Sequence, residues 1–179
     1  FGLRPYLFDP DHPRGLYQLY ARVGGNVDFG RGLVLSGYWS QNIVNQFSSI
    51  DRASDSSLPR VRSDVNRYLQ EGDSGIDTLA LTYRFSPLKS FHVMAFAGLL
   101  EDMYGGLGTE VLYAPARSRV AFGGSVAAVR QREFSRGLDF RDYQTVTGDL
   151  SLYWASPLQN LDFRISLGRY LARDWGGTL

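Results

Sequence analysis

Three alternating apolar and polar runs end in an aromatic residue, one or two small residues and a proline. These ends are Phe85-Ser86-Pro87, Tyr113-Ala114-Pro115 and Trp154-Ala155-Ser156-Pro157. Each run is followed by another of about ten residues, the length that a tilted strand needs to cross a bilayer. Aromatic rings at one end of successive strands suit the boundary between hydrocarbon and headgroups. The pattern favours an antiparallel transmembrane β-barrel over a soluble barrel whose strands end in aromatics.

Composition narrows the class further. Hydrophobic residues make up 44% of the 179 residues, but charged residues interrupt every stretch, so no run of about 18 apolar residues exists for a membrane helix. The 20 glycines and 14% aromatic residues suit sheets with tight turns. We therefore predict an all-β chain, with residues 1–179 forming one barrel domain or a barrel segment. Because the sequence opens with Phe1 and shows no export signal, we expect it to be excised from a longer chain.

The charge balance removes several classes of partner. Nineteen basic and 18 acidic residues leave a net charge of +1, so no global field attracts nucleic acid. There is no cysteine, which excludes disulfides and thiolate chemistry. We expect no nucleic-acid partner and no cofactor.

Period-two alternation predicts the strands and their faces. One clear strand sets Leu79, Leu81, Tyr83 and Phe85 against Thr78, Ala80, Thr82 and Arg84. The same pattern predicts about eight full strands, near residues 18–28, 33–40, 78–85, 91–99, 106–113, 120–131, 145–154 and 161–167, with partial strands at 3–8 and after 175. Leucine, valine and phenylalanine dominate one face, as lipid outside would select, and charges collect on the other face or in loops.

The connections alternate between short and long. Residues 30–32, 86–90, 114–118 and 155–160 are short, 43–76 and 133–143 are long, and 101–106 is intermediate. Outer-membrane barrels have short periplasmic turns and longer outer loops. The proline-containing turns should therefore face the periplasm of a Gram-negative cell, with the strands in the outer membrane.

The long segment from Leu58 to Gly72 contains three arginines, acids and an aromatic residue. We expect a short helix that folds into the lumen, where Arg62 and Arg67 pair with inward acids or bind acidic groups of a sugar. A structural plug is the alternative. The second charged group, between Arg130 and Asp142, is explained by mutual salt bridges at the barrel mouth.

Signals of catalysis and metal binding are weak. The two histidines, His12 and His92, lie in no recognisable constellation, and no serine occupies a Gly-x-Ser-x-Gly elbow. The glycines of Tyr104-Gly105-Gly106-Leu107-Gly108 are read as turn glycines rather than a phosphate loop. The acids Asp51, Asp55, Glu71 and Asp73 fit no calcium loop and are read as solvated charges. We expect a non-catalytic protein without a metal site.

Four segments are longer and more specific than the short motifs above: Arg4-Pro5-Tyr6-Leu7-Phe8-Asp9-Pro10, the stretch from Leu58 to Gly72, Phe140-Arg141-Asp142-Tyr143 and Gly168-Arg169-Tyr170-Leu171-Ala172-Arg173-Asp174. Together they resemble the YjbH/GfcD family of exopolysaccharide and capsule-associated outer-membrane proteins. The resemblance covers nearly the whole chain. It implies a β-barrel in the outer membrane that works with periplasmic and lipoprotein partners to assist polysaccharide secretion. Family members are much longer, and the resemblance carries over no catalytic residue.

We therefore expect a hydrated interior in which sugars stack on rings and hydrogen-bond to charges. Inward positions predicted from the alternation also include Tyr20 and Asp149. The candidate polysaccharide or lumen contacts are Arg22, Tyr38, Arg60, Arg62, Asp64, Arg67, Tyr68, Arg84 and Arg164. Two rivals remain open at this point: a lipid-modifying barrel enzyme, which needs a Ser/His/acid geometry, and a soluble sugar-binding β-barrel, which needs the apolar face buried.

Overall fold

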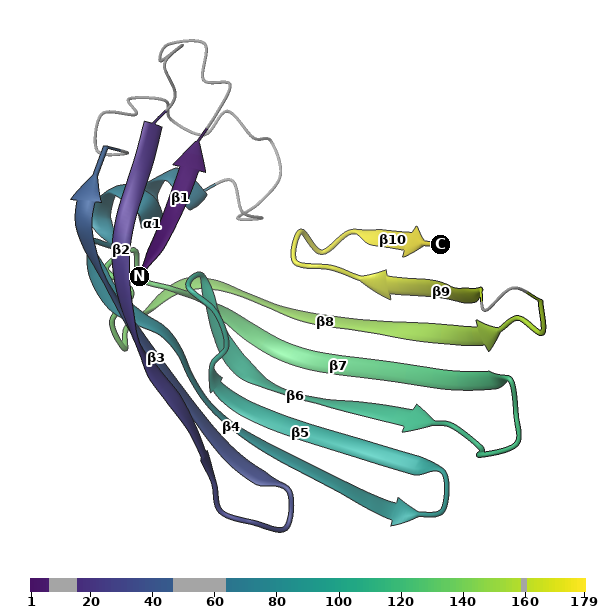
Figure 1. The fold of residues 1–179 in the computed structure, drawn as a ribbon. Coiled ribbons are helices and arrows are strands. Elements are labelled where there is room, and N and C mark those ends of the chain that lie inside the picture. Colours follow the sequence, from purple (N-terminus) through teal and green to yellow (C-terminus); the bar gives the residue numbers. More distant parts are fainter. Residues whose placement is uncertain (7–15, 47–63, 159–160) are drawn as a thin grey trace.

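The computed structural model describes residues 1–6, 16–46, 64–158 and 161–179. These residues form a single antiparallel sheet of ten strands, each paired with its neighbours in chain order (Figure 1). The strands are β1 (Gly2–Tyr6), β2 (Leu16–Asp28), β3 (Leu33–Asn45), β4 (Ser74–Leu88), β5 (Phe91–Leu99), β6 (Tyr104–Tyr113), β7 (Val120–Arg132), β8 (Phe140–Ala155), β9 (Asp162–Arg169) and β10 (Trp175–Thr178). The described ranges also contain one helix, α1, which spans Val65–Glu71.

The strand prediction is confirmed: eight long strands carry a short strand at either edge. Most boundaries agree within a few residues. β8 begins at Phe140, three residues before the expected end of its preceding loop, because Phe140 pairs with Arg132 beyond an irregularity in the register at which β8 contains the extra residues.

The two ends of the sheet differ in their connections. Residues 29–32, 89–90, 114–119 and 156–161 join strands at one end, which we call the short-turn end. At the opposite, long-loop end, the strands are joined through residues 46–73, 100–103, 133–139 and 170–174. The predicted asymmetry is confirmed for residues 46–73 and 133–139, which are longer than any connection at the short-turn end, but not for residues 100–103 and 170–174, which are as short as the turns opposite.

The sheet is curved into a trough, with α1 on its inner side near β1 and β2 (Figure 1). Each strand from β2 to β9 pairs on both sides, whereas β1 pairs only with β2 and β10 only with β9. The described residues therefore form an open wall, not a closed barrel. We call the concave side the inner face and the convex side the outer face.

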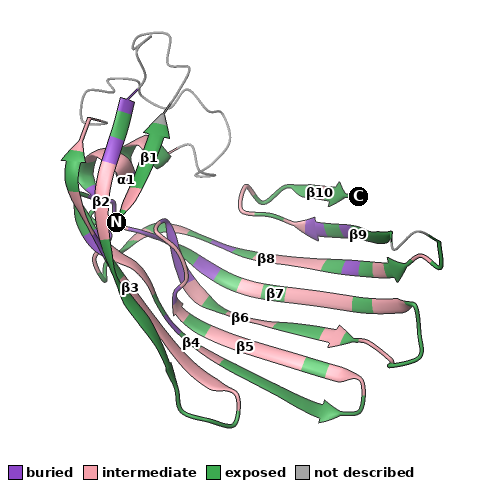
Figure 2. Cartoon of the chain, viewed as in Figure 1, coloured by how far each residue is buried: buried purple, intermediate pink, exposed green. Residues whose placement is uncertain are grey.

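Few side chains are fully buried, and most of the sheet is intermediate or exposed (Figure 2). The main buried cluster lies at the long-loop end, where α1 meets the sheet. It consists of Tyr68, Met103, Tyr104, Val129 and Phe134. A single sheet has no second layer to cover its faces, so the outer face is left exposed over β2 to β9.

Candidate functional site

The outer face carries large apolar side chains in contact with no other layer. Leu150 is 74% exposed, Leu167 66% and Leu107 62%. Strand register places one row of outward residues side by side across six strands: Phe85, Val93, Val111, Gly124, Leu150 and Leu167. A contiguous apolar surface of this kind on a folded protein marks a surface that contacts lipid or protein.

Aromatic rings gather on this outer face at the short-turn end. Phe91 packs on Tyr113 with ring centroids 4.7 Å apart, and Trp154 stacks on Phe163 at 5.4 Å. Phe85 stacks on Tyr83 at 5.0 Å. The three aromatic ends noted in the sequence therefore lie along one edge and on one face, and each has a second ring beside it.

The inner face is polar. Register aligns Arg84, Met94, Glu110, Ser125 and Asp149 in one row across β4 to β8. Of the other predicted inward residues, Tyr20 and Arg22 line a cleft beside α1, and the Arg22 guanidinium carbon lies 4.3 Å from the Tyr38 ring centroid. Arg164 lies in the same cleft as Arg84 and Asp149. All six predicted inward residues thus share the inner face.

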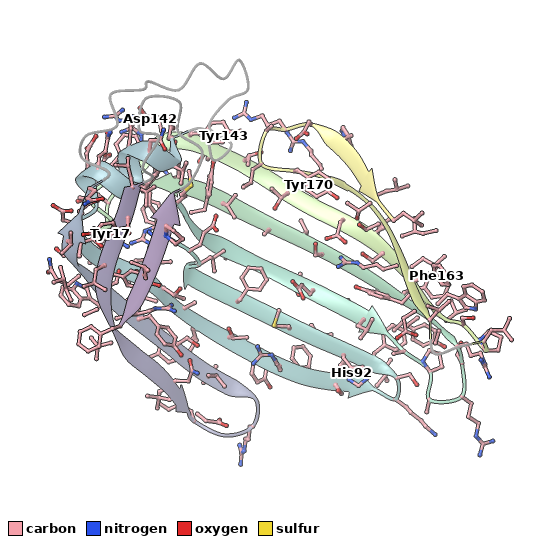
Figure 3. The ribbon with its side chains drawn as sticks, turned by 45° about the horizontal axis from the view of Figure 1, so that its top comes forward. Tyr17, His92, Asp142, Tyr143, Phe163 and Tyr170 are labelled. Atoms are coloured by element: carbon pink, nitrogen blue, oxygen red, sulfur yellow. The ribbon has the colours of Figure 1, made fainter. Side chains whose placement is uncertain are left out.

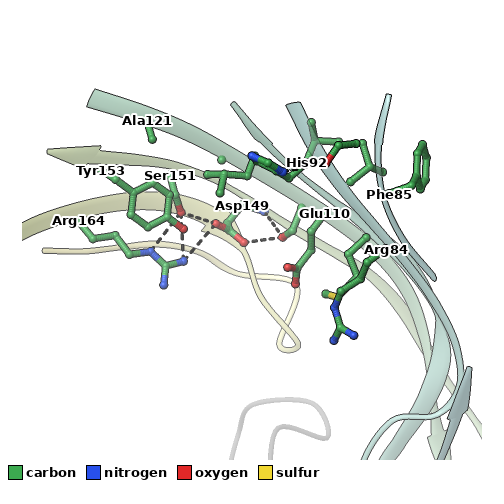
Figure 4. A pocket seen from close by; sticks show the side chains of 17 residues that line it. Arg84, Phe85, His92, Glu110, Ala121, Asp149, Ser151, Tyr153 and Arg164 are labelled. Carbon is green, nitrogen blue, oxygen red and sulfur yellow. Dashed lines mark hydrogen bonds and ion pairs between the residues drawn. The ribbon is translucent and has the colours of Figure 1, made fainter. Parts of the chain in front are cut away.

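Asp149 is the centre of a hydrogen-bond network on this face (Figure 4). Its carboxylate accepts hydrogen bonds from Ser125 Oγ at 2.5 Å and Ser151 Oγ at 2.8 Å. Arg164 lies 3.7 Å from the same carboxylate and donates to Ser151 Oγ at 3.1 Å. The network joins β7, β8 and β9 and holds Arg164 in place.

Three tyrosines of the inner face lie between a glycine and an arginine. A Cβ atom on Gly2 would meet the Tyr20 ring, one on Gly24 would meet Tyr38, and one on Gly123 would meet Tyr153. On these rings lie the guanidinium groups of Arg4, Arg22 and Arg164, respectively. Glycine leaves space on the neighbouring strand for each ring, and the arginine adds a cation–π contact.

At the long-loop end, α1 and residues 133–139 cover the inner face; we call these two segments together the plug. Tyr68 packs edge-on against Phe134 with ring centroids 4.9 Å apart. Its hydroxyl donates a hydrogen bond to the carbonyl of Arg132. Burial raises the pKa of Tyr68 to about 12, although a hydrogen bond with Gln131 acts in the opposite direction. The ring is therefore neutral at any physiological pH.

Two buried arginines anchor the plug. Arg136 Nη1 lies 3.1 Å from both Ser40 Oγ and Asp77 Oδ1, and its Nη2 donates to the carbonyl of Gly72 at 2.7 Å. Its side chain is 5% exposed. Arg132 donates to the carbonyls of Glu101, Arg136 and Gly137. Buried guanidinium groups with this many partners hold loops and helix together.

The expected helix between Leu58 and Gly72 is present as α1, and it lies on the inner face as predicted. Asp64 accepts a hydrogen bond from Gln131 at 3.0 Å. Arg67 lies over the Phe134 ring at 3.9 Å and pairs with Glu71 of its own helix at 3.0 Å. Arg60 and Arg62 lie outside the described residues. In the described part of the stretch, the contacts are those of a plug.

Only some of the ion pairs formed by the charged group between Arg130 and Asp142 join two members of that group. Arg141 pairs with Glu133 at 2.9 Å, and Arg130 lies 4.0 Å from Asp142. Arg136 instead pairs with Asp77 of β4 and lies 3.5 Å from Asp102. Sequence analysis missed Asp77, Asp102 and the burial of Arg132. The only signal was the density of charge in a long loop, which does not identify distant partners.

A serine–histidine pair lies on the inner face at the short-turn end. Ser86 Oγ is 2.9 Å from His92 Nδ1, and Figure 3 shows His92 near this edge. Within the described ranges, no carboxylate hydrogen-bonds to the other ring nitrogen, so the pair lacks the third member of a triad.

The described residues contain no group of three or more potential metal ligands. Of the four acids noted in the sequence, Asp51 and Asp55 lie outside the described ranges. No helix among the residues described here has the length and apolarity to cross a membrane.

Fold and faces define a class: an open antiparallel sheet with an apolar outer face, a polar inner face and a plug at one end. The model of the YjbH family, described as "Exopolysaccharide biosynthesis protein YbjH", matches residues 2–179. The chain therefore belongs to the YjbH family. It is 36% identical over 176 residues to "Uncharacterized lipoprotein YjbH" of Escherichia coli (strain K12), a match that covers 93% of this chain and 25% of the relative. No solved structure matches it.

Proposed function

We propose that the chain forms part of the wall of an outer-membrane β-barrel whose parent protein assists export of an exopolysaccharide without covalent chemistry. The observation that carries the proposal is the separation of the two faces. Along β8, Leu150 and Leu152 point outward, whereas the alternating residues Asp149 and Ser151 line the inner cleft. In water, this arrangement leaves apolar surface exposed, whereas in a bilayer it places that surface against lipid.

The aromatic rows support an orientation. Rings on the outer face at the short-turn end occupy the position of an interfacial girdle. In outer-membrane barrels, this end faces the periplasm. In the proposed arrangement, the plug therefore lies toward the outer side of the membrane.

The open edges β1 and β10 fit a wall that needs further strands, because unpaired backbone groups are not tolerated in hydrocarbon. The chain spans a quarter of the relative that it matches. We propose that other strands of the parent protein complete the wall. Family membership supports the role in exopolysaccharide production, and the polar inner face supports contact with a glycan. Periplasmic and lipoprotein partners belong to the same proposal.

A pair of adjacent substitutions in the full-length parent tests the membrane assignment. Leu81→Arg places a charge on the outer face and Thr82→Arg places the same charge on the inner face of the same strand. At the bilayer midplane, Leu81→Arg should reduce the free energy of unfolding by about 2–4 kcal/mol. Thr82→Arg should cost clearly less. Folding free energy measured in lipid vesicles decides the point, and equal losses for the two variants would refute the assignment.

A further inference from the structure

The inner face holds a cleft of about 750 Å³ between the plug and the short-turn end. Small inward side chains of β7 form its floor, including Ala121, Gly123 and Ser125. One side is formed by Arg84 and Met94 with Glu110, and the other by Tyr153 with the Asp149 network (Figure 4). Gly123 has no side chain, so the Tyr153 ring packs directly beside it. A Cβ atom at this position would lie 3.1 Å from the ring.

Two charged side chains on one side of this cleft have no polar partner among the described residues. Arg84 and Glu110 are exposed and lie in one cross-strand row, separated by Met94. Neither forms a hydrogen bond or ion pair with a residue that the structure describes. On the other side, by contrast, Asp149 and Arg164 satisfy each other and the two serines. The cleft thus combines a preorganised side with a side whose donors and acceptors are available.

The charges of the cleft balance. Its two arginines, Arg84 and Arg164, face two carboxylates, Glu110 and Asp149. A polyanion would gain from the arginines and lose as much to the carboxylates. A neutral ligand rich in hydroxyl groups can donate to a carboxylate and accept from a guanidinium at the same time.

We propose that this cleft binds an uncharged stretch of a saccharide chain, with Glu110 and Arg84 hydrogen-bonding to its hydroxyl groups. Tyr153 and Met94 supply apolar contact for the sugar rings, and the Asp149 network keeps Arg164 and Tyr153 in position. The inference rests on the proposed export function and specifies which part of the inner face contacts the glycan. It also separates this cleft from the plug, whose arginines are occupied by protein groups.

Binding to the full-length parent in detergent tests the assignment, with maltoheptaose as neutral probe and an oligogalacturonate of similar length as acidic probe. Saturation-transfer NMR detects contact, and a titration gives the Kd. Maltoheptaose should bind with an affinity that changes little between low and high salt, because no net charge is involved. Glu110→Gln and Arg84→Gln should each weaken it about fivefold to tenfold, since each removes a charge-assisted hydrogen bond.

Matched controls lie outside the cleft. Asp142→Asn at the long-loop end and Arg31→Gln in the turn between β2 and β3 should leave binding unchanged. Tighter, salt-sensitive binding of the acidic probe would overturn the proposal, as would equal effects of cleft and control variants. Water solubility of the parent without detergent, together with intact Glu110-dependent binding of maltoheptaose, would refute the membrane proposal and leave this site standing. Membrane insertion without binding of maltoheptaose would refute the saccharide site and leave the membrane proposal standing.

Discussion

Arg136 offers the sharpest test of how the plug is held. Arg136→Met retains much of the apolar stem but removes the contacts to Ser40, Asp77 and the carbonyl of Gly72. Removing one partner of a buried ion pair costs about 3–5 kcal/mol. Asp77 keeps Arg22, whose Nε lies 2.7 Å away, so the loss should fall near the lower limit. We expect about 3 kcal/mol, confined to the plug.

Hydrogen exchange of the full-length parent in detergent measures this loss locally. The amide of Ile76 donates to the carbonyl of Arg136 at 3.0 Å, and it reports directly on loop docking. A local loss of about 3 kcal/mol speeds exchange roughly a hundredfold, and α1 should show the same change. Amides in the centre of β5 and β6 should not change, because those strands do not contact Arg136.

Arg141→Met is the matched control. Arg141 belongs to the same charged group, but its pair with Glu133 is partly exposed, with side-chain exposures of 32% and 40%. Such a pair contributes at most about 1 kcal/mol. The Arg141 guanidinium also lies 4.3 Å from the centroid of the Phe134 ring, and a cation–π contact at a partly exposed site adds about 0.5–1 kcal/mol, so the total loss should stay below that of Arg136→Met. If Arg141→Met loosened the plug as much as Arg136→Met, or if neither changed exchange in α1, the anchoring role assigned to Arg136 would be wrong.

Two further predictions concern stability. The pKa of Tyr68 is about 12 in the folded chain against 10.0 for an ordinary tyrosine. The unfolded chain therefore loses this proton at a lower pH than the folded chain, so thermal stability should fall as the pH rises from 10 through 12. Tyr68→Phe should remove that part of the pH dependence, and a profile that stays unchanged in this variant would contradict the assignment. Gly98 has a φ of +134°, and a Cβ there would lie 2.2 Å from the carbonyl oxygen of Leu79. Gly98→Ala should cost about 1–3 kcal/mol, whereas Gly25→Ala, with nothing within 4 Å, should be nearly neutral in chemical denaturation.

The sheet was predictable because its determinants are local. Leu150, Leu152 and Trp154 alternate with Asp149, Ser151 and Tyr153, and this period of two fixes both the strand and its faces. Short connections fix the antiparallel neighbours. Closure is a property of the two edges, which the period does not encode, and the described residues leave β1 and β10 unpaired to each other.

The plug was predictable only in part. The sequence from Leu58 to Gly72 indicated a short helix because the segment is too long and too ordered in composition for a plain linker. It did not indicate that Arg136 reaches Asp77 of another hairpin, because ion pairs between distant segments depend on how a loop folds over the sheet. Similarly, the sequence does not distinguish the serines around Asp149 from other inward residues. Only strand register brings Ser125 Oγ to 2.5 Å from the Asp149 carboxylate.

Nitroxide scanning along β8 tests the central claim most directly. The chain contains no cysteine, so single cysteines at positions 149 to 154 introduce unique labels in this segment of the parent, reconstituted in vesicles. We predict that labels at positions 150, 152 and 154 are relaxed mainly by oxygen, which concentrates in lipid, and that labels at 149, 151 and 153 are relaxed mainly by a water-soluble nickel chelate. The two profiles should alternate out of phase with a period of two. Profiles in phase, or outer positions as accessible to the chelate as inner ones, would contradict a lipid-facing wall.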